Sequence, residues 1–188
     1  MLHTNNVRRL GLALLTLFMV SSCALFQDSP DKVFQVVGLN SNLLPTDFER
    51  HFKEVRQHKA QDSLQMVDPE TNSMKKVTAQ EYFDFLYGKR FEDVLKKVSA
   101  LKDNEEVTPI KNAALDMFKT ADEIYQKDFP PIAKMIDDKA PDAEIDAAIA
   151  KLQETRGEEL HKKLKTTMGL LVPYAVKHGV EFKTIEMP

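Results

Sequence analysis

The chain has 188 residues, and its 26 Lys and Arg against 29 Asp and Glu give a formal net charge of −3 at pH 7. A slightly acidic chain argues against a nucleic-acid-binding protein, because such proteins concentrate positive charge where they meet phosphate. The single cysteine excludes an intramolecular disulfide. A chain of this length can bury one substantial core, so we expect packing to stabilise it.

The first residues have the pattern of a secretory signal peptide. Arg8 and Arg9 precede residues 10–20, which carry no charge, and a positive segment before a short apolar one is typical of such signals. A helix of 11 residues is about 17 Å long, whereas the hydrocarbon core of a bilayer is about 30 Å thick. The run is therefore too short for a permanent transmembrane helix, and no later segment is long and apolar enough.

The segment Val20-Ser21-Ser22-Cys23 resembles the lipobox of bacterial lipoproteins, in which an aliphatic residue and two small residues precede a cysteine. The resemblance covers residues 1–23. It implies cleavage before Cys23, a diacylglycerol on its sulfur and a fatty acyl chain such as palmitate on its amine. Several acyl chains make a stable anchor, whereas one binds marginally. The alternative is an ordinary signal peptide followed by an unmodified cysteine, and the coincidence of arginines, apolar run, small residues and cysteine favours lipidation.

The same resemblance implies a place in the bacterial envelope. Ala24 follows the cysteine where inner-membrane lipoproteins tend to carry aspartate, so we expect an outer-membrane lipoprotein that faces the periplasm. The chain then divides into a signal peptide (1–22), a lipidated tether (23–29) and a single helical domain (30–188). The expected partners are the membrane, through the lipid at Cys23, and an envelope protein. We expect no nucleic acid and no cofactor besides the covalent lipid.

The segment after the tether favours a short helix over residues 30–38. Ser29-Pro30 is typical of a helix start and Gly38 of a helix end. Residues 33–37, VFQVV, would equally suit a strand, because a short apolar run does not distinguish the two structures. We expect residues 40–45 to form a loop.

Two capping boxes mark later helix starts. In Thr46-Asp47-Phe48-Glu49 and in Thr78-Ala79-Gln80-Glu81, the threonine oxygen binds an amide of the first turn and the glutamate binds the amide of the threonine. Apolar residues then recur at spacings of three or four, which predicts amphipathic helices over residues 46–60 and 79–102. These positions are Phe48, Phe52 and Val55 in the first helix, and Phe83, Tyr87, Phe91, Val94, Val98 and Leu101 in the second.

Residues 63–77, between these two helices, lack a helical period. Asp68-Pro69 and Asn72-Ser73 are sequences typical of turns. The short flanks of this turn region, residues 64–67 and 74–77, can pair as a β-hairpin. An irregular loop is the alternative.

Thr108-Pro109 is typical of another helix start. The apolar stripe that follows is Ile110, Ala114, Met117, Ala121, Ile124 and Tyr125. Pro130-Pro131 should interrupt it, because proline crowds the preceding turn and disfavours the α conformation in the residue before it. We expect a short helix over residues 132–138 that resumes at an angle.

Residues 142–178 form the longest predicted helix. Its apolar stripe, interrupted by Arg156, is Ile145, Ile149, Leu152, Leu160, Leu164, Met168, Leu171 and Ala175. Its 37 residues would be about 55 Å long, so the helix of residues 79–102, about 36 Å long, cannot cover it. Either the end of this helix projects beyond its partner or the helix bends at Pro173, and we favour the bend. We expect the helix to end at Gly179 and residues 180–183 to form a single strand.

These elements predict a mainly α protein. The fold is an antiparallel helical bundle with a long kinked C-terminal helix and a short β-hairpin near residues 63–77. Strands do not alternate with helices along the sequence, which argues against a parallel α/β fold.

The sequence lacks the common catalytic and metal-binding motifs. It contains no nucleophile elbow, no P-loop and no His-Glu-x-x-His motif. His51 and His58 lie seven residues apart on one predicted helix, a rise of about 10.5 Å, which is too far for both to bind one ion. We interpret them as solvated surface histidines, and we predict no catalytic residue and no metal site.

The segment YFDFLYGKRF, residues 82–91, is the strongest candidate for a binding surface. Its aromatic side chains are Tyr82, Phe83, Phe85, Tyr87 and Phe91. On one continuous helix the large side chains of this segment would spread over about 240° of the circumference, more than one buried stripe requires. We favour a central helix that is covered on both sides. The alternative is a groove or partner surface lined by these aromatic residues.

Three functions are compatible with this sequence. The favoured one is a membrane-anchored extracytoplasmic lipoprotein that acts as a non-enzymatic protein-binding or structural module of the envelope. The alternative is a carrier of a small apolar ligand or lipid, with a cavity between the long helix and the aromatic helix. A cell-wall enzyme is the least favoured, because the spacing of the carboxylates does not suggest a catalytic cleft.

Overall fold

The computed structural model describes residues 27–45 and 47–182, which form a mainly α-helical bundle with one small antiparallel hairpin. Segments labelled η are turns of π-helix, in which the helix is locally wider. In chain order the elements are α2 (Pro30–Phe34), η2 (Gln35–Leu39), α3 (Phe48–Ala60), β1 (Gln65–Val67), β2 (Met74–Lys76), α4 (Ala79–Tyr87), α5 (Glu92–Ser99), α6 (Val107–Glu123), η3 (Ile124–Asp128), α7 (Phe129–Asp137), α8 (Asp142–Leu152), η4 (Gln153–Gly157) and α9 (Glu158–Lys177).

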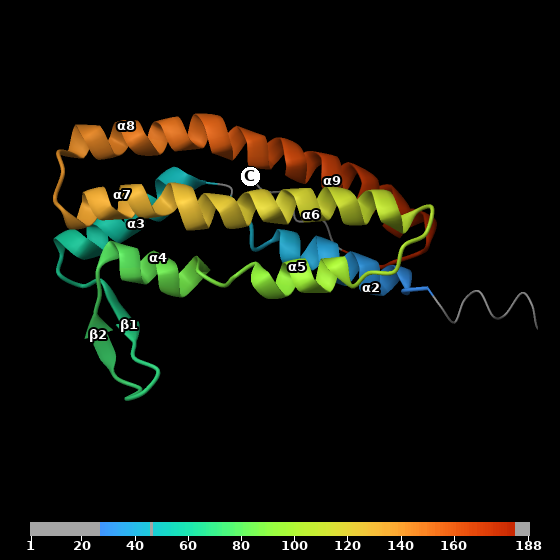
Figure 1. Ribbon diagram of the computed structural model, residues 1–188, viewed down its shortest axis with the longest axis horizontal. Helices are drawn as coiled ribbons and strands as arrows, with labels where there is room; N and C mark the ends of the chain where they lie inside the picture. The colour runs from blue at the N-terminus through green and yellow to red at the C-terminus, as the bar shows by residue number, and fades with distance from the viewer. Residues whose placement is uncertain (1–26, 46, 183–188) are drawn as a thin grey trace, which may run out of the picture.

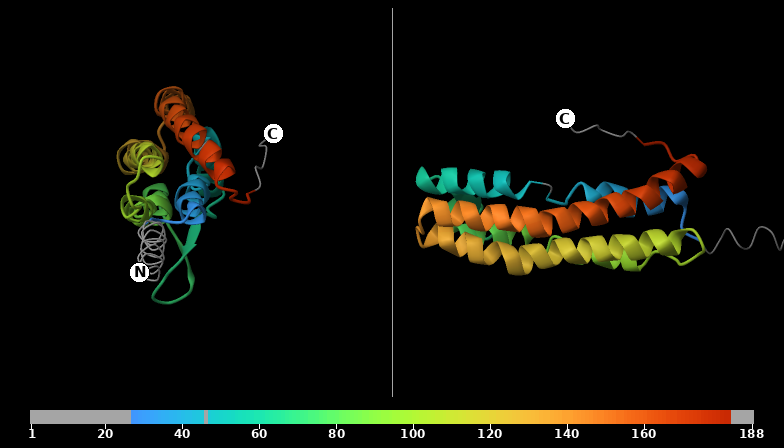
Figure 2. Two further views of the ribbon diagram at one scale, coloured as in Figure 1. Left: turned by 90° about the vertical axis from the view of Figure 1, so that its right-hand side faces the viewer. Right: turned by 90° about the horizontal axis from the view of Figure 1, so that it is seen from above.

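These helices lie in four antiparallel rows along the long axis of the molecule (Figure 1). The rows are α2–η2–α3, α4–α5, α6–η3–α7 and α8–η4–α9. The third row packs against the fourth through α6 and α9, and against the second through α4 with α7 and α5 with α6. The first row packs against the fourth through α2 with α9 and α3 with α8. The end-on view of Figure 2 shows the rows grouped around a common interior, which confirms the predicted antiparallel bundle.

The third row stays helical through two prolines that the sequence predicts to interrupt it. η3 lies directly before Pro130 and Pro131, which occupy the first turn of α7. A proline has no amide donor and crowds the carbonyl four residues earlier, and a π-turn at this point gives the chain a wider path. Figure 1 shows α6 and α7 in line, so the predicted change of direction before residues 132–138 is wrong.

The second row breaks where the sequence predicts one helix over residues 79–102. α4 ends at Tyr87 and α5 begins at Glu92. Gly88 caps α4, and its carbonyl accepts a hydrogen bond from Nε2 of Gln126 at 2.6 Å. Glycine favours an interruption because it is a poor helix former, and this carbonyl is satisfied outside the helix. The prediction of a single helix is therefore wrong.

Capping residues decide where α3 and α4 begin. The capping box at Thr78 is confirmed: its hydroxyl accepts from the amide of Glu81 at 3.0 Å, and the Glu81 carboxylate accepts from the amide of Thr78 at 2.7 Å. Asp47 caps α3 by accepting from the amide of Arg50 at 2.9 Å. The capping residue of α3 is therefore Asp47, whereas the sequence predicts Thr46. Thr46 itself lies outside the described residues.

Two further helix limits differ from the prediction. α6 begins at Val107 rather than after Thr108, and the side-chain oxygen of Asn104, in the turn before the helix, accepts from two backbone amides, that of Val107 at 2.7 Å among them. Ser29 caps α2 as predicted, and residues 30–38 are helical rather than extended. The predicted end at Gly38 is wrong, because Gly38 lies inside η2.

The fourth row is one long helix, as predicted, and it curves gradually rather than at one visible point. α8, η4 and α9 follow one another without a break, and Figures 1 and 2 show the row curving through α9, which contains Pro173. Gly179 ends the helix with φ of 68°, and the amide of Val180 bonds the carbonyl of Ala175 at 2.9 Å. Residues 180–182 form no strand, and residue 183 lies outside the described residues.

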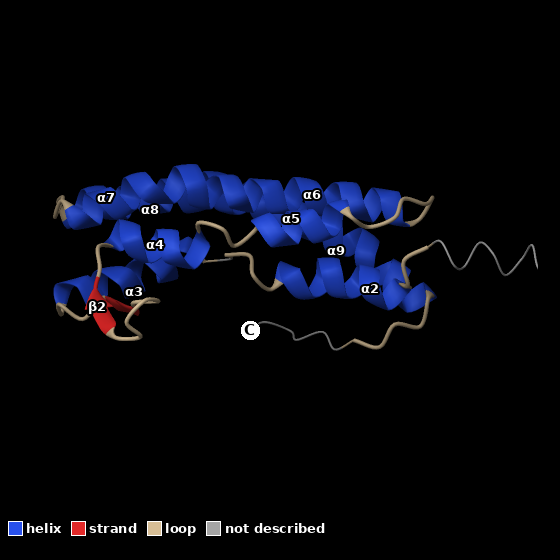
Figure 3. Cartoon of the chain, turned by 60° about the horizontal axis from the view of Figure 1, so that its bottom comes forward, coloured by secondary structure: helices blue, strands red, loops and turns tan. Residues whose placement is uncertain are grey.

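The hairpin of β1 and β2 confirms one of the two structures predicted for residues 63–77. It pairs Gln65 with Lys76, Met66 with Lys75, and Val67 with Met74. In the turn, Asn72 has a φ of 53°, and Oδ1 of Asp68 accepts hydrogen bonds from two turn amides. Leu64 and Val77, at its base, are buried in the core. The hairpin projects sideways from the bundle (Figures 1 and 3).

Candidate functional site

Asp28 fixes the N-terminal chain to the bundle. Its Oδ1 accepts a hydrogen bond from Nζ of Lys32 at 2.6 Å, and its Oδ2 accepts from the backbone amide of Lys102 at 2.7 Å. Burial alone would raise the pKa of Asp28, but these hydrogen bonds outweigh it and hold the pKa below its usual value. The charged carboxylate therefore ties the chain to the α5–α6 loop. Cys23, the predicted lipidation site, lies outside the described residues.

The five aromatic residues of the predicted binding surface do not share one surface. Phe83, Tyr87 and Phe91 are buried in the core, Tyr82 is half-buried, and Phe85 is 58% exposed. The break between α4 and α5 separates Phe91 from the helix that carries the other four. Three of the five side chains therefore belong to the interior, and Phe85 alone is widely exposed to solvent.

Phe129 of α7 lies at the centre of an aromatic interior. Its ring centroid is within 5.5 Å of those of Phe48, Phe52, Phe83 and Tyr125. Several of these contacts are edge-to-face, the arrangement that aromatic pairs favour. Since α7 packs against both α4 and α8, these rings fill the space where the carrier hypothesis places a cavity.

The sequence predicts that His51 is solvated. The structure shows it half-buried against this aromatic interior, so the prediction is wrong. Its Nδ1 lies 3.1 Å from the hydroxyl oxygen of Tyr87, and the ring of Tyr87 stacks in parallel on that of Tyr125 at 4.0 Å. The Arg90 guanidinium lies 5.3 Å from the centroid of the Tyr87 ring. Burial lowers the pKa of His51 and raises the pKa of Tyr87. Both side chains are therefore neutral near pH 7, and the pair holds α3 against α4.

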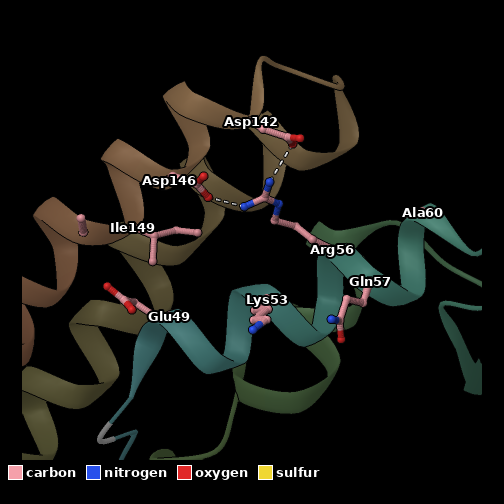
Figure 4. Close-up of a pocket in the computed structure, with 9 residues that line it drawn as sticks. Glu49, Lys53, Arg56, Gln57, Ala60, Asp142, Asp146 and Ile149 are labelled. Carbon is pink, nitrogen blue, oxygen red and sulfur yellow. Dashed lines mark hydrogen bonds and ion pairs between the residues drawn. The ribbon is translucent and has the colours of Figure 1, made fainter.

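A groove of about 650 Å³ lies between α3 and α8 (Figure 4). Arg56 of α3 reaches across it and donates hydrogen bonds to Asp142, at 2.6 Å, and to Asp146 of α8. Ile149 and Ala150 contribute apolar lining. Three carboxylates against two cations give the lining a formal charge of −1, so the groove suits a neutral or cationic small ligand better than an anion. The sequence does not reveal this site, since its two walls lie about 90 residues apart.

The hairpin exposes two apolar side chains at paired positions. Val67 is 46% exposed and Met74 is 61% exposed, and they are directly opposite each other. Opposite residues of an antiparallel pair project from the same face of the sheet. They therefore form a small apolar patch on the hairpin, which projects from the bundle (Figure 1).

Two charged residues connect the rows through contacts that the sequence does not reveal. Asp137 of α7 accepts hydrogen bonds from the first amides of α4, that of Ala79 at 2.8 Å, and pairs with Lys59 at 2.8 Å. Arg156 of η4 pairs with Asp128 of η3 at 3.0 Å, so the two π-turns are joined. Their partners are distant in sequence, so local spacing carries no signal for these contacts.

No cluster of His, Cys, Asp and Glu within residues 27–45 and 47–182 has the arrangement of a metal site. In the same part of the chain, no helix combines the length and apolar character that crossing a membrane requires. No family model matches this chain, no curated protein matches its sequence and no solved structure matches its fold. Its function is therefore argued from its own residues.

Proposed function

We propose that this chain is a membrane-anchored lipoprotein of the bacterial envelope that acts as a non-enzymatic protein-binding or structural module. The observation that carries the proposal is the short distance in sequence between Cys23, at the end of the lipobox, and Asp28, which is bonded to the bundle. The five residues after Cys23 span at most about 18 Å when extended. A lipid on Cys23 would hold the bundle directly at the bilayer, and Ala24 favours the outer membrane.

The tethered end and the hairpin lie at opposite ends of the bundle. Lys102, which is bonded to Asp28, comes just before α6, whereas Asp137, the last residue of α7, is bonded to Ala79, just after the hairpin. From Val107 to Asp137 the third row contains 31 residues, a rise of about 46 Å. A bundle standing on its tether would present the hairpin about that far from the lipid (Figure 1).

The exposed patch on the hairpin supports a docking role. An isolated two-stranded hairpin is only marginally stable, and its exposed apolar residues add little to the stability of a bundle. Val67 and Met74 are nevertheless both apolar and exposed. Contact with another protein is the simplest role for such a patch, because binding would remove both side chains from water.

Mass spectrometry of the N-terminus tests the anchor. We expect a peptide that begins at Cys23 and carries the added mass of the acyl chains. A Cys23→Ser variant should lack this mass and leave the membrane fraction, because its sulfur is absent. An unprocessed Met1, or a Cys23 without added acyl mass, would refute the proposal.

Affinity capture from membranes tests the docking role. We expect one stoichiometric partner with the parent chain and its loss from a Val67→Ser/Met74→Ser variant. Leu39→Ser is the matched control, because Leu39 is an exposed apolar residue of the first row, 57% exposed, outside the hairpin. Equal recovery with all three chains would show that the hairpin is not the docking surface.

Binding of a small ligand is a second candidate function, and the volume of the α3–α8 groove favours it. About 650 Å³ lies within the range of small-molecule sites. An Ala150→Trp variant should fill the groove, since Ala150 lines it and is exposed. Native mass spectrometry should then detect a copurified small molecule with the parent chain and not with the variant. A parent chain without a bound molecule would count against this function.

A further inference from the structure

The two edges of the hairpin differ in charge. The strand β1, Gln65–Val67, carries no ionisable side chain, whereas β2, Met74–Lys76, carries Lys75 and Lys76. Lysines on an edge strand discourage pairing with another chain, since a second strand would have to approach their charges. The lysines therefore protect the outer edge of β2 against pairing with a strand of another chain, whereas the outer edge of β1 has no such protection.

The backbone groups at the outer edge of β1 are free to pair. The amide of Val77 bonds the carbonyl of Leu64 at 3.1 Å, and the amide of Asp68 bonds the carbonyl of Ser73 at 2.8 Å. Bonded pairs alternate along an antiparallel ladder, so residues 64, 66 and 68 direct their backbone groups towards β2. Residues 65 and 67 direct theirs outward, and no backbone bond to another element involves them in the described part of the chain.

We propose that β1 pairs antiparallel with β1 of a second copy of this chain, which joins two hairpins into one four-stranded sheet. In this register Gln65 lies opposite Val67 of the second copy, so that outward-facing backbone groups meet and bond. Met66 lies opposite Met66 of the second copy. Each hairpin thereby gains the additional strands that a small sheet requires for stability.

Charge and register together favour a second copy as the occupant. The β1 pairing is self-complementary: residue 65 of each copy lies opposite residue 67 of the other, with Met66 on the two-fold axis. It also brings no like charges together, whereas the equivalent pairing of two β2 strands would place Lys75 opposite Lys75.

The proposed membrane anchor, on which this inference rests in part, would strengthen a small contact. Copies tethered through Cys23 would carry their hairpins at the same height above the bilayer, and the hairpins project sideways from the bundle (Figures 1 and 2). Confinement to one surface raises the effective concentration of the second copy without adding any contact. A pairing of two short strands could then be populated on the membrane.

A Met66→Cys variant of the full chain tests the pairing by disulfide cross-linking. A non-bonded antiparallel pair has Cα atoms about 4.5 Å apart, which lies within the range of a disulfide. Mild oxidation of intact membranes should convert this variant to a disulfide-linked dimer, and a reducing agent should return it to the monomer. Glu70→Cys is the matched control, because residue 70 is exposed in the same hairpin but lies outside the proposed seam. It should form several-fold less dimer.

A pair of charge variants in the Met66→Cys background separates strand pairing from random collision. Gln65→Glu with Val67→Glu places like charges opposite each other in the proposed register, and the dimer should decrease several-fold. Gln65→Glu with Val67→Lys places opposite charges there, and the dimer should return. The charge changes affect exposed residues only, and the change of the half-buried Met66 is common to both variants, so a difference in dimer between them reports on the pairing.

The parent chain distinguishes failure of the anchor from failure of the pairing. Its one cysteine is Cys23, so a disulfide dimer of the parent chain would reveal a free thiol and refute lipidation. If the parent stays monomeric while Met66→Cys gives no more dimer than Glu70→Cys, the pairing is refuted, and the mass of the N-terminal peptide decides separately on the anchor. Cross-linking of Met66→Cys to a protein of another mass would also overturn the proposal of a second copy.

Discussion

The aromatic interior and the hairpin use apolar residues in opposite ways. In the interior, Phe129 is fully buried and contacts rings from α3, α4 and η3. In the hairpin, Val67 and Met74 are exposed and face solvent together. Apolar residues of the first region hold the rows together, whereas the side chains of Val67 and Met74 contribute little to the fold. This contrast supports the docking role that we propose for the hairpin.

The largest effect should follow from a change in the interior. Phe129→Ala should lower the free energy of unfolding by about 3–5 kcal/mol, because it removes buried surface and leaves a cavity among the surrounding rings. Denaturant unfolding measures this loss. Phe85→Ala is the matched control on the exposed side of α4, and it should change stability by less than about 0.5 kcal/mol. Equal losses of stability in the two variants would show that Phe129 does not hold the rows together.

An intermediate effect should follow at the contact between α7 and α4. Asp137→Ala should cost about 1.5–3 kcal/mol at pH 7, because the first amides of α4 and the ammonium of Lys59 lose a charged partner. Asp138→Ala, which removes only an exposed pair with Lys134, is the control. Chemical denaturation of both variants should show a clear loss for Asp137→Ala alone.

The same residue predicts a pH dependence. Burial alone would raise the pKa of Asp137, but the hydrogen bonds from Lys59 and the α4 amides outweigh it, and the pKa is lowered. Its contribution should therefore be complete above the pKa of the unfolded chain and disappear as pH falls through the folded value. An Asp137→Ala variant whose stability follows the parent curve through that range would contradict this account.

A smaller effect should appear at the rim of the interior, at His51. Burial lowers its pKa below 6.5, although Glu54 and Asp47 oppose this and Arg50 and Arg90 favour it. The unfolded chain therefore takes up this proton first, and the free energy of unfolding should decrease as pH falls from 7 towards the folded pKa. Unfolding between pH 7 and 5 should be less pH-dependent in a His51→Gln variant. If the free energy of unfolding depends on pH equally in the parent and in the variant, burial does not lower the pKa of His51.

The smallest effect on stability should follow in the hairpin. Val67→Ser and Met74→Ser should each change the free energy of unfolding by less than about 0.5 kcal/mol, because both side chains are already exposed. Thermal unfolding monitored by circular dichroism checks this expectation. A loss comparable to that of Phe129→Ala would mean that the hairpin belongs to the folding core after all.

Short-range signals in the sequence predicted the fold well. The capping box at Thr78, the turn sequence at Asp68-Pro69 and the stop at Gly179 each act within a few residues, so each was visible in the sequence. The break at Gly88 was missed because it also depends on a bond from Gln126. The uninterrupted third row was missed because a π-turn allows the helix to continue through the proline pair.

The candidate sites were predicted less well, because they depend on distant partners. The segment at residues 82–91 looked unusual as one helix, yet the break after α4 and the rings of other rows bury three of its aromatic residues. Arg56 has its partners on α8, and His51 has its partner on α4. Neither pairing follows from the spacing of residues on α3.

The hydrogen bonds of Asp28 have a consequence for the entropy of association. Since the chain is bonded to the bundle five residues after Cys23, a lipid-anchored molecule would stay within about 18 Å of the bilayer. A freely diffusing protein loses translational and rotational freedom when it binds, and that loss opposes association. A molecule confined to the membrane surface would already have lost part of its translational freedom. Contacts as small as three residues of one strand could then suffice for recognition at the membrane surface.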